Sequence, residues 1–269
     1  MGLYRKLVLP RFLNSVMGST ELKKFRPEVV SAASGAVLEI GVGPGYNISL
    51  YKNISKLYAL EPSQELINIA KRRATGLLFP IEFLEASAEH IPLPESSVDT
   101  VVSTWTLCSV TQPKKSLNEV LRVLRPGGLF VFIDHGASSN LFIRAIQKIL
   151  TPFTKHFTGN CHMDRDIKKL ILDAGFTISN SKEFSQRLFK PLIYNTQGVA
   201  VASKPTRPDC ALSVLQWSGS TPSATGPAGS PRAPLPSNVD IPYSAILAEW
   251  CTYLLNLLQG RPHGLPCSF

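Results

Sequence analysis

Residues 37–47 restrict the fold of this chain more than any other segment. A short apolar run leads into three glycines at alternate positions, Gly41, Gly43 and Gly45. Glycine adopts positive φ without strain and carries no Cβ, so such a turn brings backbone N–H groups close to a ligand at the start of a helix. We therefore expect a buried strand that ends in a nucleotide-binding turn, as in open α/β sheets.

The spacing of the glycines separates two classes of nucleotide-binding protein. A dinucleotide-binding fingerprint, G-x-G-x-x-G, would place a glycine at Tyr46, whereas the chain has G-x-G-x-G preceded by Glu39. This pattern resembles the first motif of class I S-adenosylmethionine (SAM) methyltransferases. The resemblance implies that Glu39 and the three glycines bind SAM, and it disfavours an NAD-dependent oxidoreductase.

A second acidic residue follows the next expected strand. Residues 56–60 are rich in apolar side chains and end at Glu61. A carboxylate at the end of this strand can accept hydrogen bonds from both hydroxyls of a ribose, which is what adenosine recognition needs. The alternative for Glu61 is a solvated loop acid.

Two further segments, residues 86–93 and 97–103, resemble the third and fourth motifs of the same family. Many relatives have an aspartate at the position of Ser87 to contact adenine, so here Ser87 or the backbone around Ala88 would serve. Thr104 and Trp105, at the end of the fourth strand, complete the predicted cofactor site. The alternative for Trp105 is an aromatic residue that fills the core.

Strand-like apolar runs alternate with helical patterns over residues 35–204, the predicted SAM-binding domain. This rhythm predicts a parallel sheet with helices on both faces. The resemblance implies a doubly wound, mostly parallel, seven-stranded Rossmann-like sheet. We expect a helix over 116–124, a Pro-Gly-Gly turn before a strand over 129–133, and a helix over 163–174.

The two ends of the chain differ in character from this domain. Residues 1–34 form a basic lead-in in which we expect helices. One hypothesis is that these helices cover the cofactor, line the acceptor pocket or rest on a lipid surface, and the alternative is that they dock on the core. Residues 205–240 are rich in Pro, Ser and Gly and predict a disordered linker. Residues 241–260 have apolar residues at helical spacing, which predicts a helix. The hypotheses for this helix are that it binds a partner, a membrane surface or the SAM-binding domain itself, or that it is an extension with no role in catalysis.

Composition limits which binding partners and which cellular compartment we expect. The 28 Lys and Arg residues outnumber the 19 Asp and Glu residues, and the excess lies before residue 205. A basic surface suits anionic lipid, an acidic substrate or simple solubility, and no basic cluster with interleaved aromatics predicts nucleic-acid binding. Residues 1–10 lack the apolar run of a signal peptide or spanning segment. We expect a cytoplasmic protein that is not secreted, with peripheral membrane contact through the basic N-terminal segment or the C-terminal helix.

The five cysteines are widely spaced along the chain, and no C-x-x-C pair occurs among them. This arrangement predicts neither a disulfide framework nor a metal site, and it favours a reducing compartment.

Four later segments make the resemblance more specific. Residues 101–110, 119–128, 132–136 and 159–165 together resemble the methyltransferase-like branch that includes mammalian alkyl-thiol S-methyltransferases and bacterial relatives. The resemblance covers roughly residues 23–202. It implies SAM-dependent methylation of a small, apolar acceptor, with a thiol first and a lipid or quinone-like acceptor second. A third hypothesis is a SAM-binding protein without catalysis that acts as an interaction module.

Methyl transfer from SAM requires the nucleophile to be aligned about 3 Å from the methyl carbon and water to be excluded. A thiol reacts as its thiolate, so a base or a cation assists. The predicted catalytic residues are His135, with Asp134 to orient it, and Arg165; the alternative for the Asp-His pair is a strand-end cap. Cys108 and Cys161 are predicted to contact the acceptor, with a small structural hydrophobe as the alternative. Aromatic residues predicted to line the acceptor pocket, or else to pack in the core, are Phe153, Phe157, Phe189 and Tyr194.

Overall fold

The computed structural model describes residue 4, residues 8–185 and residues 193–202. The predicted linker over 205–240, the predicted helix over 241–260 and Phe189 lie outside the described residues.

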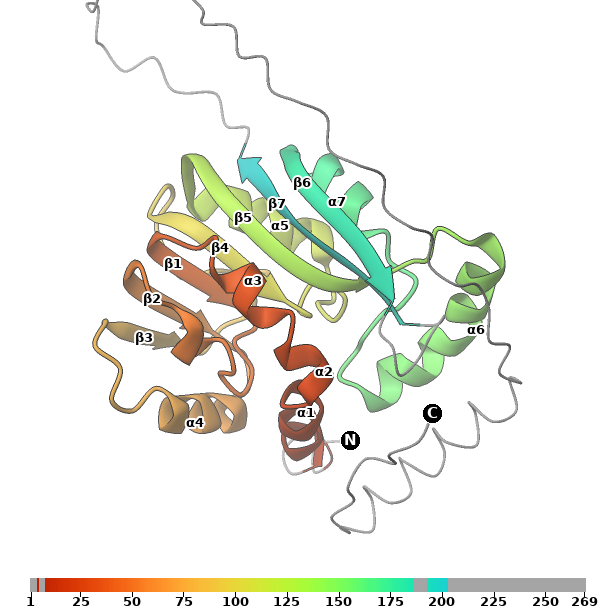
Figure 1. Cartoon of the computed structure of the whole chain (residues 1–269), viewed down its shortest axis with the longest axis horizontal. Helices are drawn as coiled ribbons and strands as arrows, with labels where there is room; N and C mark the ends of the chain where they lie inside the picture. Colours follow the sequence, from red (N-terminus) through yellow and green to blue (C-terminus); the bar gives the residue numbers. More distant parts are fainter. Residues whose placement is uncertain (1–3, 5–7, 186–192, 203–269) are drawn as a thin grey trace, which may run out of the picture. The chain divides into compact units, whose positions relative to one another are not determined.

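A mixed sheet of seven strands lies at the centre of the fold (Figure 1). In chain order the strands are β1 (Gly35–Ile40), β2 (Ile54–Leu60), β3 (Ile81–Leu84), β4 (Val98–Thr104), β5 (Leu124–Gly136), β6 (Phe176–Ser185) and β7 (Tyr194–Ala202). Their order across the sheet is β3-β2-β1-β4-β5-β7-β6. Neighbours from β3 to β5 are parallel, whereas β7 runs antiparallel to both β5 and β6. The predicted doubly wound, mostly parallel seven-stranded fold is confirmed.

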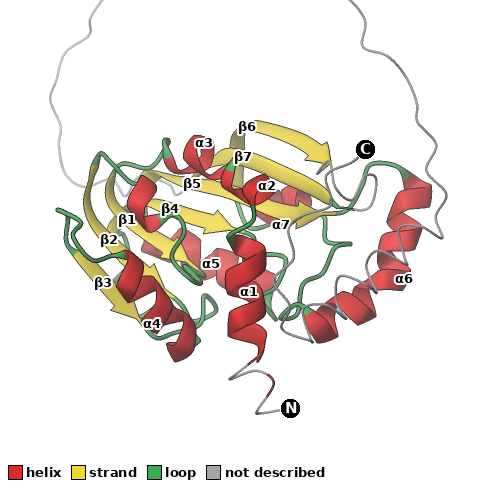
Figure 2. Ribbon diagram, turned by 60° about the horizontal axis from the view of Figure 1, so that its bottom comes forward, coloured by secondary structure: helices red, strands yellow, loops and turns green. Residues whose placement is uncertain are grey.

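Helices cover both faces of this sheet (Figure 2). The helices of the described residues are α1 (Leu9–Met17), α2 (Thr20–Lys23), α3 (Arg26–Val30), the 3₁₀ turn η2 (Ile48–Leu50), α4 (Gln64–Arg73), α5 (Pro113–Val123), α6 (Leu141–Phe157) and α7 (Ile167–Asp173), of which α6 lies beside the sheet rather than on a face. Successive side chains of a strand point to opposite faces, so β5 contributes to two cores. Phe130 and Phe132 pack in the core formed with α5 and α7, whereas Val131 and Ile133 pack in the core formed with α2, α3 and α4.

Some element boundaries differ from those predicted. Helix α5 begins at Pro113 rather than Ser116, since proline suits the first turn of a helix. Helix α7 begins at Ile167 rather than Met163, because the Asp166 side chain accepts a hydrogen bond from the Lys169 N–H and caps the helix there. The Pro-Gly-Gly segment lies within β5 instead of before it, and the β4–β5 register is irregular at this end.

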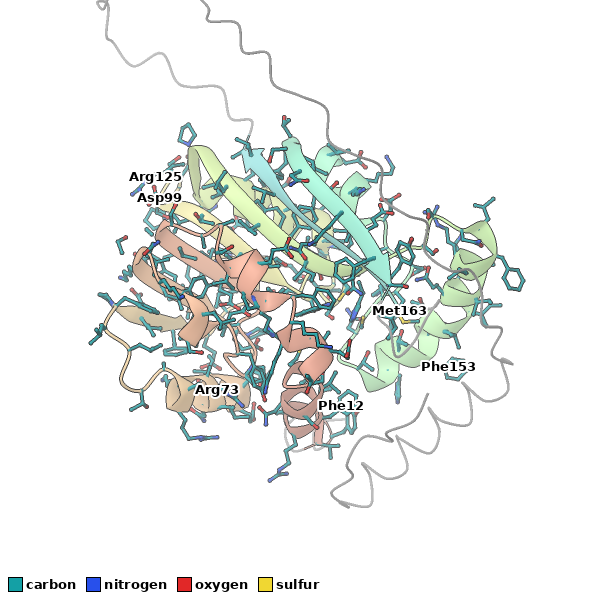
Figure 3. The ribbon with its side chains drawn as sticks, in the orientation of Figure 1. Phe12, Arg73, Asp99, Arg125, Phe153 and Met163 are labelled. Atoms are coloured by element: carbon teal, nitrogen blue, oxygen red, sulfur yellow. The ribbon has the colours of Figure 1, made fainter. Side chains whose placement is uncertain are left out.

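The lead-in packs beside the glycine turn. The Tyr46 hydroxyl donates a hydrogen bond to the backbone oxygen of Asn14 in α1 at 2.9 Å, and Arg73 of α4 donates to the Asn14 side chain at 3.0 Å. Figure 3 shows Arg73 on α4 beside α1. Leu22 and Val29 are buried in the core, which agrees with the alternative that this segment docks on the domain. In the described part of the chain, no helix has the length and apolar character needed to cross a membrane.

Candidate active site

The glycine turn follows β1 and all three of its glycines have positive φ. A Cβ at Gly41 would collide with the Thr106 side chain, and one at Gly45 would lie 2.9 Å from the Cα of Ala70. At Gly43, where φ is +54°, the nearest atom to such a Cβ is the Gly41 oxygen at 3.8 Å. Gly41 and Gly45 are therefore required by packing, whereas Gly43 borders an open cradle that a side chain would fill.

Glu61 lies directly after β2 and reaches the glycine turn. Its carboxylate accepts hydrogen bonds from the Gly43 N–H at 3.1 Å and the Ser63 N–H at 3.0 Å. Burial raises the pKa of Glu61 to about 7, although both hydrogen bonds act to lower it. A carboxylate has about four acceptor positions, so capacity remains for ribose hydroxyls. The fold thus brings two predicted cofactor residues, Gly43 and Glu61, into direct contact.

Glu39 lies in a buried polar network under the turn. Its carboxylate accepts hydrogen bonds from the Asn47 side chain at 2.7 Å and the Tyr51 hydroxyl at 2.9 Å. Asn47 also donates to the Thr104 hydroxyl and accepts from Arg26 at 2.8 Å. Burial raises the pKa of Glu39 to about 7, opposed by Tyr51, Arg26 and Asn47. Glu39 and Thr104 therefore fix the segment after the glycines, and their direct contact with SAM stays a prediction.

Sequence reasoning missed three members of this network, Arg26, Asn47 and Tyr51. Asn47 and Tyr51 are polar residues soon after the glycines, so their position could have suggested a role in holding the turn. Arg26 carries no such signal, because its link to Asn47 joins α3 to a segment 21 positions away.

Ser87 and Ala88 lie in the turn after β3, at the same carboxyl edge of the parallel strands. The Ser87 hydroxyl accepts a hydrogen bond from the Glu89 N–H at 3.2 Å, and the Ser87 carbonyl accepts one from the His90 N–H at 2.9 Å. The Ala88 side chain is buried in the core beside α5. The turn is therefore ordered by its own hydrogen bonds, and its contact with adenine stays a prediction.

Trp105 follows β4 with a φ of +55°, which is unusual for a bulky residue and marks a strained backbone. Its indole N–H donates to the Asn195 side chain at 3.0 Å, and the Arg26 guanidinium lies 4.9 Å from its ring centroid. Trp105 is buried with the second core, so the structure gives it the core role that the sequence left open. Asn195, which comes from β7, was not anticipated.

Asp134 is fully buried at the end of β5. Its carboxylate accepts hydrogen bonds from the Ser103 hydroxyl and the Cys108 N–H, both at 3.1 Å. In the described part of the chain its hydrogen bonds go to Ser103 and Cys108, and the predicted role of Asp134 in orienting His135 stays a prediction. Asp134 ties the loop after β4 to β5, and burial raises its pKa to about 6.

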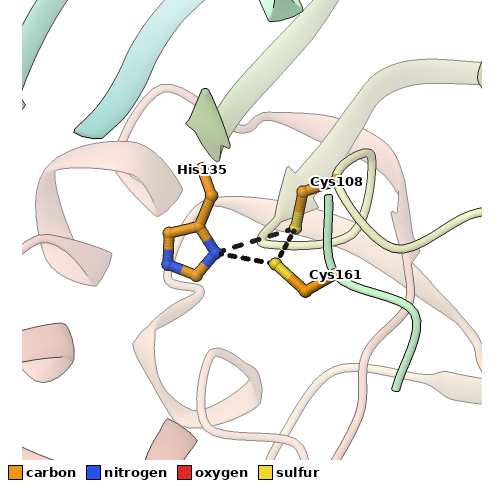
Figure 4. Close-up of side chains that lie close together, drawn as sticks. All are labelled: Cys108, His135 and Cys161. Atoms are coloured by element: carbon orange, nitrogen blue, oxygen red, sulfur yellow. Dashed lines mark hydrogen bonds between the residues drawn. The ribbon is translucent and has the colours of Figure 1, made fainter. Parts of the chain in front are cut away.

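His135 faces two cysteine sulfurs (Figure 4). Its Nδ1 lies 3.4 Å from the Sγ of Cys161 and 3.8 Å from the Sγ of Cys108, and the two Sγ atoms are 3.6 Å apart. The sequence separates the cysteines by 53 positions and gave no metal-ligand spacing, but the loop after β4 and the segment before α7 meet here. The spacing of the cysteines along the chain predicted no ligand set, and the fold nevertheless brings two of them together with His135.

Arg165 lies against the same loop and donates a hydrogen bond to the Leu107 carbonyl. Burial lowers its pKa, while Cys108, Asp134 and Cys161 act in the opposite direction. The three predicted catalytic residues and the two predicted acceptor-contacting cysteines therefore meet at the carboxyl ends of β4 and β5. Phe153, in contrast, is 64% exposed and does not line this site.

The fold and the site define a class of protein. A Rossmann-like sheet with a glycine cradle and an acidic residue after β2 is typical of enzymes that bind a nucleoside cofactor at the carboxyl ends of the strands.

Comparison with known proteins refines this class. Residues 38–132 match the family described as "Methyltransferase domain". Thiol S-methyltransferase TMT1B of Rattus norvegicus is 36% identical over 149 residues, which are 52% of this chain and 59% of that protein. Phosphatidylethanolamine N-methyltransferase of Cereibacter sphaeroides is 30% identical over 146 residues, 54% of this chain and 71% of that protein. The chain spans about three fifths of the length of the thiol S-methyltransferases named TMT1B that it matches.

A solved structure has the same fold. The SAM-dependent methyltransferase of Thermotoga maritima superposes with a TM-score of 0.53 at 21% identity, covering 74% of this chain and 99% of that one. The chain belongs to the class I SAM-dependent methyltransferase family. Its cofactor is SAM, and the Gly43 cradle and the Glu61 carboxylate fit this cofactor.

Proposed function

We propose that this methyltransferase acts on the sulfur of small, apolar thiols. The observation that carries the proposal is that His135 and Arg165 meet beside the loop that follows β4. This loop also contacts the glycine turn, because the Thr106 hydroxyl donates to the Ile40 carbonyl at 3.0 Å. Groups able to stabilise a thiolate therefore lie next to the cofactor cradle. Similarity to thiol S-methyltransferases supports the same acceptor class.

Bound SAM supplies an electrophilic methyl group on a sulfonium sulfur. Gly43 leaves room for the cofactor, and Glu61 accepts hydrogen bonds from its ribose. The Arg165 cation lowers the pKa of an acceptor thiol by stabilising the thiolate. The Nδ1 of His135 faces the cysteine sulfurs, so its Nε2 is the atom left to take the thiol proton.

The surroundings of this site favour an apolar acceptor. Cys108, Cys161 and Met163 form a small buried cluster, and Leu150 of α6 packs against it. Thiol and thioether sulfurs and a leucine side chain form an environment of low polarity, which excludes water from the reacting atoms.

The test is transfer of labelled methyl from SAM to hexanethiol and thiophenol, with hexanol as the acceptor that differs only in the nucleophilic atom. Wild-type protein is expected to form the labelled thioethers, and Glu61→Ala is expected to form none. Arg165→Gln is expected to lower kcat/KM for hexanethiol at least tenfold near pH 7 and less at a pH where the free thiol ionises.

The matched control for Arg165→Gln is Arg125→Gln. Arg125 forms an ion pair with Asp99 at the opposite end of the sheet from Met163 (Figure 3). Equal losses in the two variants would remove Arg165 from the site. Label that appears in hexanol as readily as in hexanethiol would overturn the thiol assignment.

A phospholipid acceptor is the second candidate, and α6 favours it. Four large apolar side chains of this helix are exposed, Leu141, Phe142, Ile149 and Phe153. At 100° per residue they lie within one arc of the helix, and the exposed Lys148 and Lys155 border that arc. An apolar face with a basic border suits an anionic phospholipid surface, while Leu150 of the same helix packs against the cysteine cluster.

This candidate is tested with vesicles that contain phosphatidylethanolamine and an anionic phospholipid. We expect the double variant Ile149→Ser and Phe153→Ser to weaken sedimentation with these vesicles, with little change in stability because both side chains are exposed. Leu78→Ser is the control, since Leu78 is fully exposed outside α6. Labelled lipid without labelled thioether would favour the phospholipid acceptor.

A further inference from the structure

Cys108, His135 and Cys161 form a set of three ligands for one metal ion. Their Sγ and Nδ1 atoms all lie within 4.8 Å of one another, with separations of 3.4, 3.6 and 3.8 Å. Tetrahedral Zn²⁺ with bonds of about 2.3 Å to sulfur and about 2.0 to 2.1 Å to nitrogen places ligand atoms about 3.5 to 3.8 Å apart. The three side chains therefore need little movement to share one ion.

The backbone of each ligand residue is held by neighbouring groups. The Cys108 N–H donates to Asp134, and the Cys108 carbonyl accepts from the His162 N–H at 2.8 Å. The Cys161 carbonyl accepts a hydrogen bond from the Thr154 hydroxyl of α6 at 2.9 Å. His135 lies at the carboxyl end of β5, a strand that is paired with β4 on one side and β7 on the other. A metal site needs this kind of fixed support for its ligands.

The chemistry of the donor atoms favours zinc. Two thiolates and an imidazole are soft and intermediate ligands, which suit Zn²⁺ better than Mg²⁺ or Ca²⁺. Two thiolates balance the two charges of the ion. The neighbouring charges are the Arg165 guanidinium and the Asp134 carboxylate, which oppose one another.

We propose that Cys108, His135 and Cys161 bind Zn²⁺ and leave its fourth position open to the sulfur of the acceptor. This role rests on the proposed thiol acceptor, whereas metal binding itself does not. Sites with three protein ligands and an open position are typical of catalytic rather than structural zinc. Coordination of the acceptor sulfur to the ion keeps it deprotonated near neutral pH, since a coordinating thiol loses its proton.

Methyl transfer in this arrangement breaks the S–H bond of the acceptor and the carbon–sulfonium bond of SAM, and it forms one new carbon–sulfur bond. The acceptor loses its S–H proton to solvent as its sulfur binds the ion, because the Nε2 of a His135 that binds through Nδ1 already carries the ring proton. A sulfur electron pair then forms the bond to the methyl carbon while the carbon–sulfonium bond of SAM breaks. The products are a neutral thioether and S-adenosylhomocysteine, and the thioether is a weaker ligand that leaves the ion.

A disulfide between the two cysteines is the competing use of this pair. Their Sγ atoms are 3.6 Å apart, whereas a disulfide bond requires about 2.05 Å. The separation fits two ligands of a common ion, and oxidation of the pair is an outcome that the experiment must detect.

The experiment uses the full chain without a metal-binding tag, kept reduced and loaded with Zn²⁺ or Co²⁺ alone. We expect one zinc ion per chain by elemental analysis and native mass spectrometry. The cobalt form is expected to show thiolate-to-cobalt charge-transfer absorption. Cys108→Ser, Cys161→Ser and His135→Gln are each expected to weaken zinc affinity at least tenfold, and binding of S-adenosylhomocysteine reports whether each variant is folded.

The remaining cysteines supply a matched control. A triple variant with serine at Cys210, Cys251 and Cys267 is expected to bind zinc as tightly as wild type, because these residues are not part of the ligand set. Unchanged zinc binding in Cys108→Ser and Cys161→Ser, or its loss in the triple variant, would overturn the site. So would a Cys108–Cys161 disulfide that persists in the protein isolated under reducing conditions.

Metal content and methyl transfer separate the two proposals. Zinc bound at this site without methylation of any thiol would support the metal site and sink the thiol acceptor. Full thiol methylation by metal-free protein would support the acceptor and overturn the role of zinc in activating it.

Discussion

Gly43 and Gly76 have similar backbone conformations in different surroundings. Their φ values are +54° and +84°, and neither would place a Cβ against another described part of the protein. Alanine costs about 1 to 2 kcal/mol at either position because positive φ is strained for an L-residue. Only Gly43 borders the cofactor cradle.

We therefore expect Gly43→Ala to weaken binding of S-adenosylhomocysteine more than tenfold, because its methyl group enters the cradle. Gly76→Ala is expected to lower the free energy of unfolding by about 1 to 2 kcal/mol, as Gly43→Ala does, without changing the affinity for S-adenosylhomocysteine. Isothermal titration calorimetry and urea unfolding measure the two quantities. Equal loss of affinity in both variants would show that Gly43 does not contact the cofactor.

Glu61 gives cofactor binding a dependence on pH. Its pKa is raised to about 7, and only the ionised carboxylate is a full acceptor for two ribose hydroxyls. The ionised fraction rises from about a tenth at pH 6 to about nine tenths at pH 8. We expect the affinity for S-adenosylhomocysteine to rise several-fold over this interval.

Glu61→Gln is the control for this prediction. Glutamine has a similar shape and no charge, so the variant is expected to bind more weakly and with a flatter pH profile. A profile as steep as that of wild type would assign the titration to another group, with Glu39 as the first candidate because its pKa is also raised to about 7.

At the scale of elements, Asp134 joins β5 to the loop that follows β4. Its removal in Asp134→Ala leaves the buried Cys108 N–H without this acceptor, at a cost of about 1 to 3 kcal/mol. Asp134→Asn is expected to cost less, because an amide oxygen still accepts from Cys108 and the Ser103 hydroxyl can turn to accept from the amide nitrogen.

Urea unfolding and hydrogen exchange at the Cys108 amide measure these effects. Faster exchange is expected in Asp134→Ala than in Asp134→Asn. If the two variants exchange at the same rate as wild type, the loop is held by other contacts, such as the bond from the His162 N–H to the Cys108 carbonyl.

The sequence predicted those elements whose signals are local. The apolar run before Gly41, the glycine spacing and the acidic residue at Glu61 are each contained in a few neighbouring positions, and the structure confirms the fold that they indicate. Helix α6 was not predicted, although its apolar residues recur at helical spacing; what the pattern does not indicate is that its apolar side is exposed.

The chemistry of the site depends on contacts that no local pattern encodes. Cys108 and Cys161 lie 53 positions apart in the sequence. Their sulfurs come together because the loop after β4 meets the segment before α7 in the fold. The Trp105–Asn195 hydrogen bond spans 90 positions for the same reason. Asp134 and His135 are neighbours in sequence and were predicted to act as a pair, and both contact Cys108, the first at its backbone N–H and the second at its sulfur.

At the scale of the whole molecule, three buried acids govern stability near neutral pH. Burial raises the pKa values of Glu39 and Glu61 to about 7 and that of Asp134 to about 6. The unfolded chain releases these protons near pH 4, whereas the folded chain keeps them until pH 6 to 7. Their contribution to stability is therefore complete below about pH 4, falls between about pH 4 and pH 7, and is gone at higher pH.

Other groups contribute stability that is lost as the pH falls rather than as it rises. Burial lowers the pKa of His162 to about 4, so its contribution is lost as pH falls from about 6.5 to 4. The pKa of Asp99 is lowered by the hydrogen bond from the Ala36 N–H and by Arg125, against its desolvation, and the pKa of Glu119 is lowered chiefly by Arg122. Both contributions are lost below about pH 4.

We expect the cofactor-free protein to be more stable at about pH 5 to 6 than at pH 8, because the three acids outnumber His162 over that interval. The urea midpoint at these pH values measures the difference, and Glu61→Gln is expected to reduce it. A higher midpoint at pH 8 would show that the buried acids are ionised in the folded protein. Stability and cofactor affinity thus respond to pH in opposite directions.

β7 is the last described strand in chain order, yet it lies between β5 and β6. During synthesis the edge of β5 stays unpaired until residues 194–202 have left the ribosome. The parallel strands that carry the glycine turn and Glu61 emerge earlier, and pairing between segments distant in sequence is slow. A nascent chain therefore forms the strands that carry the glycine turn and Glu61 before Asn195 emerges to accept the hydrogen bond of the Trp105 indole.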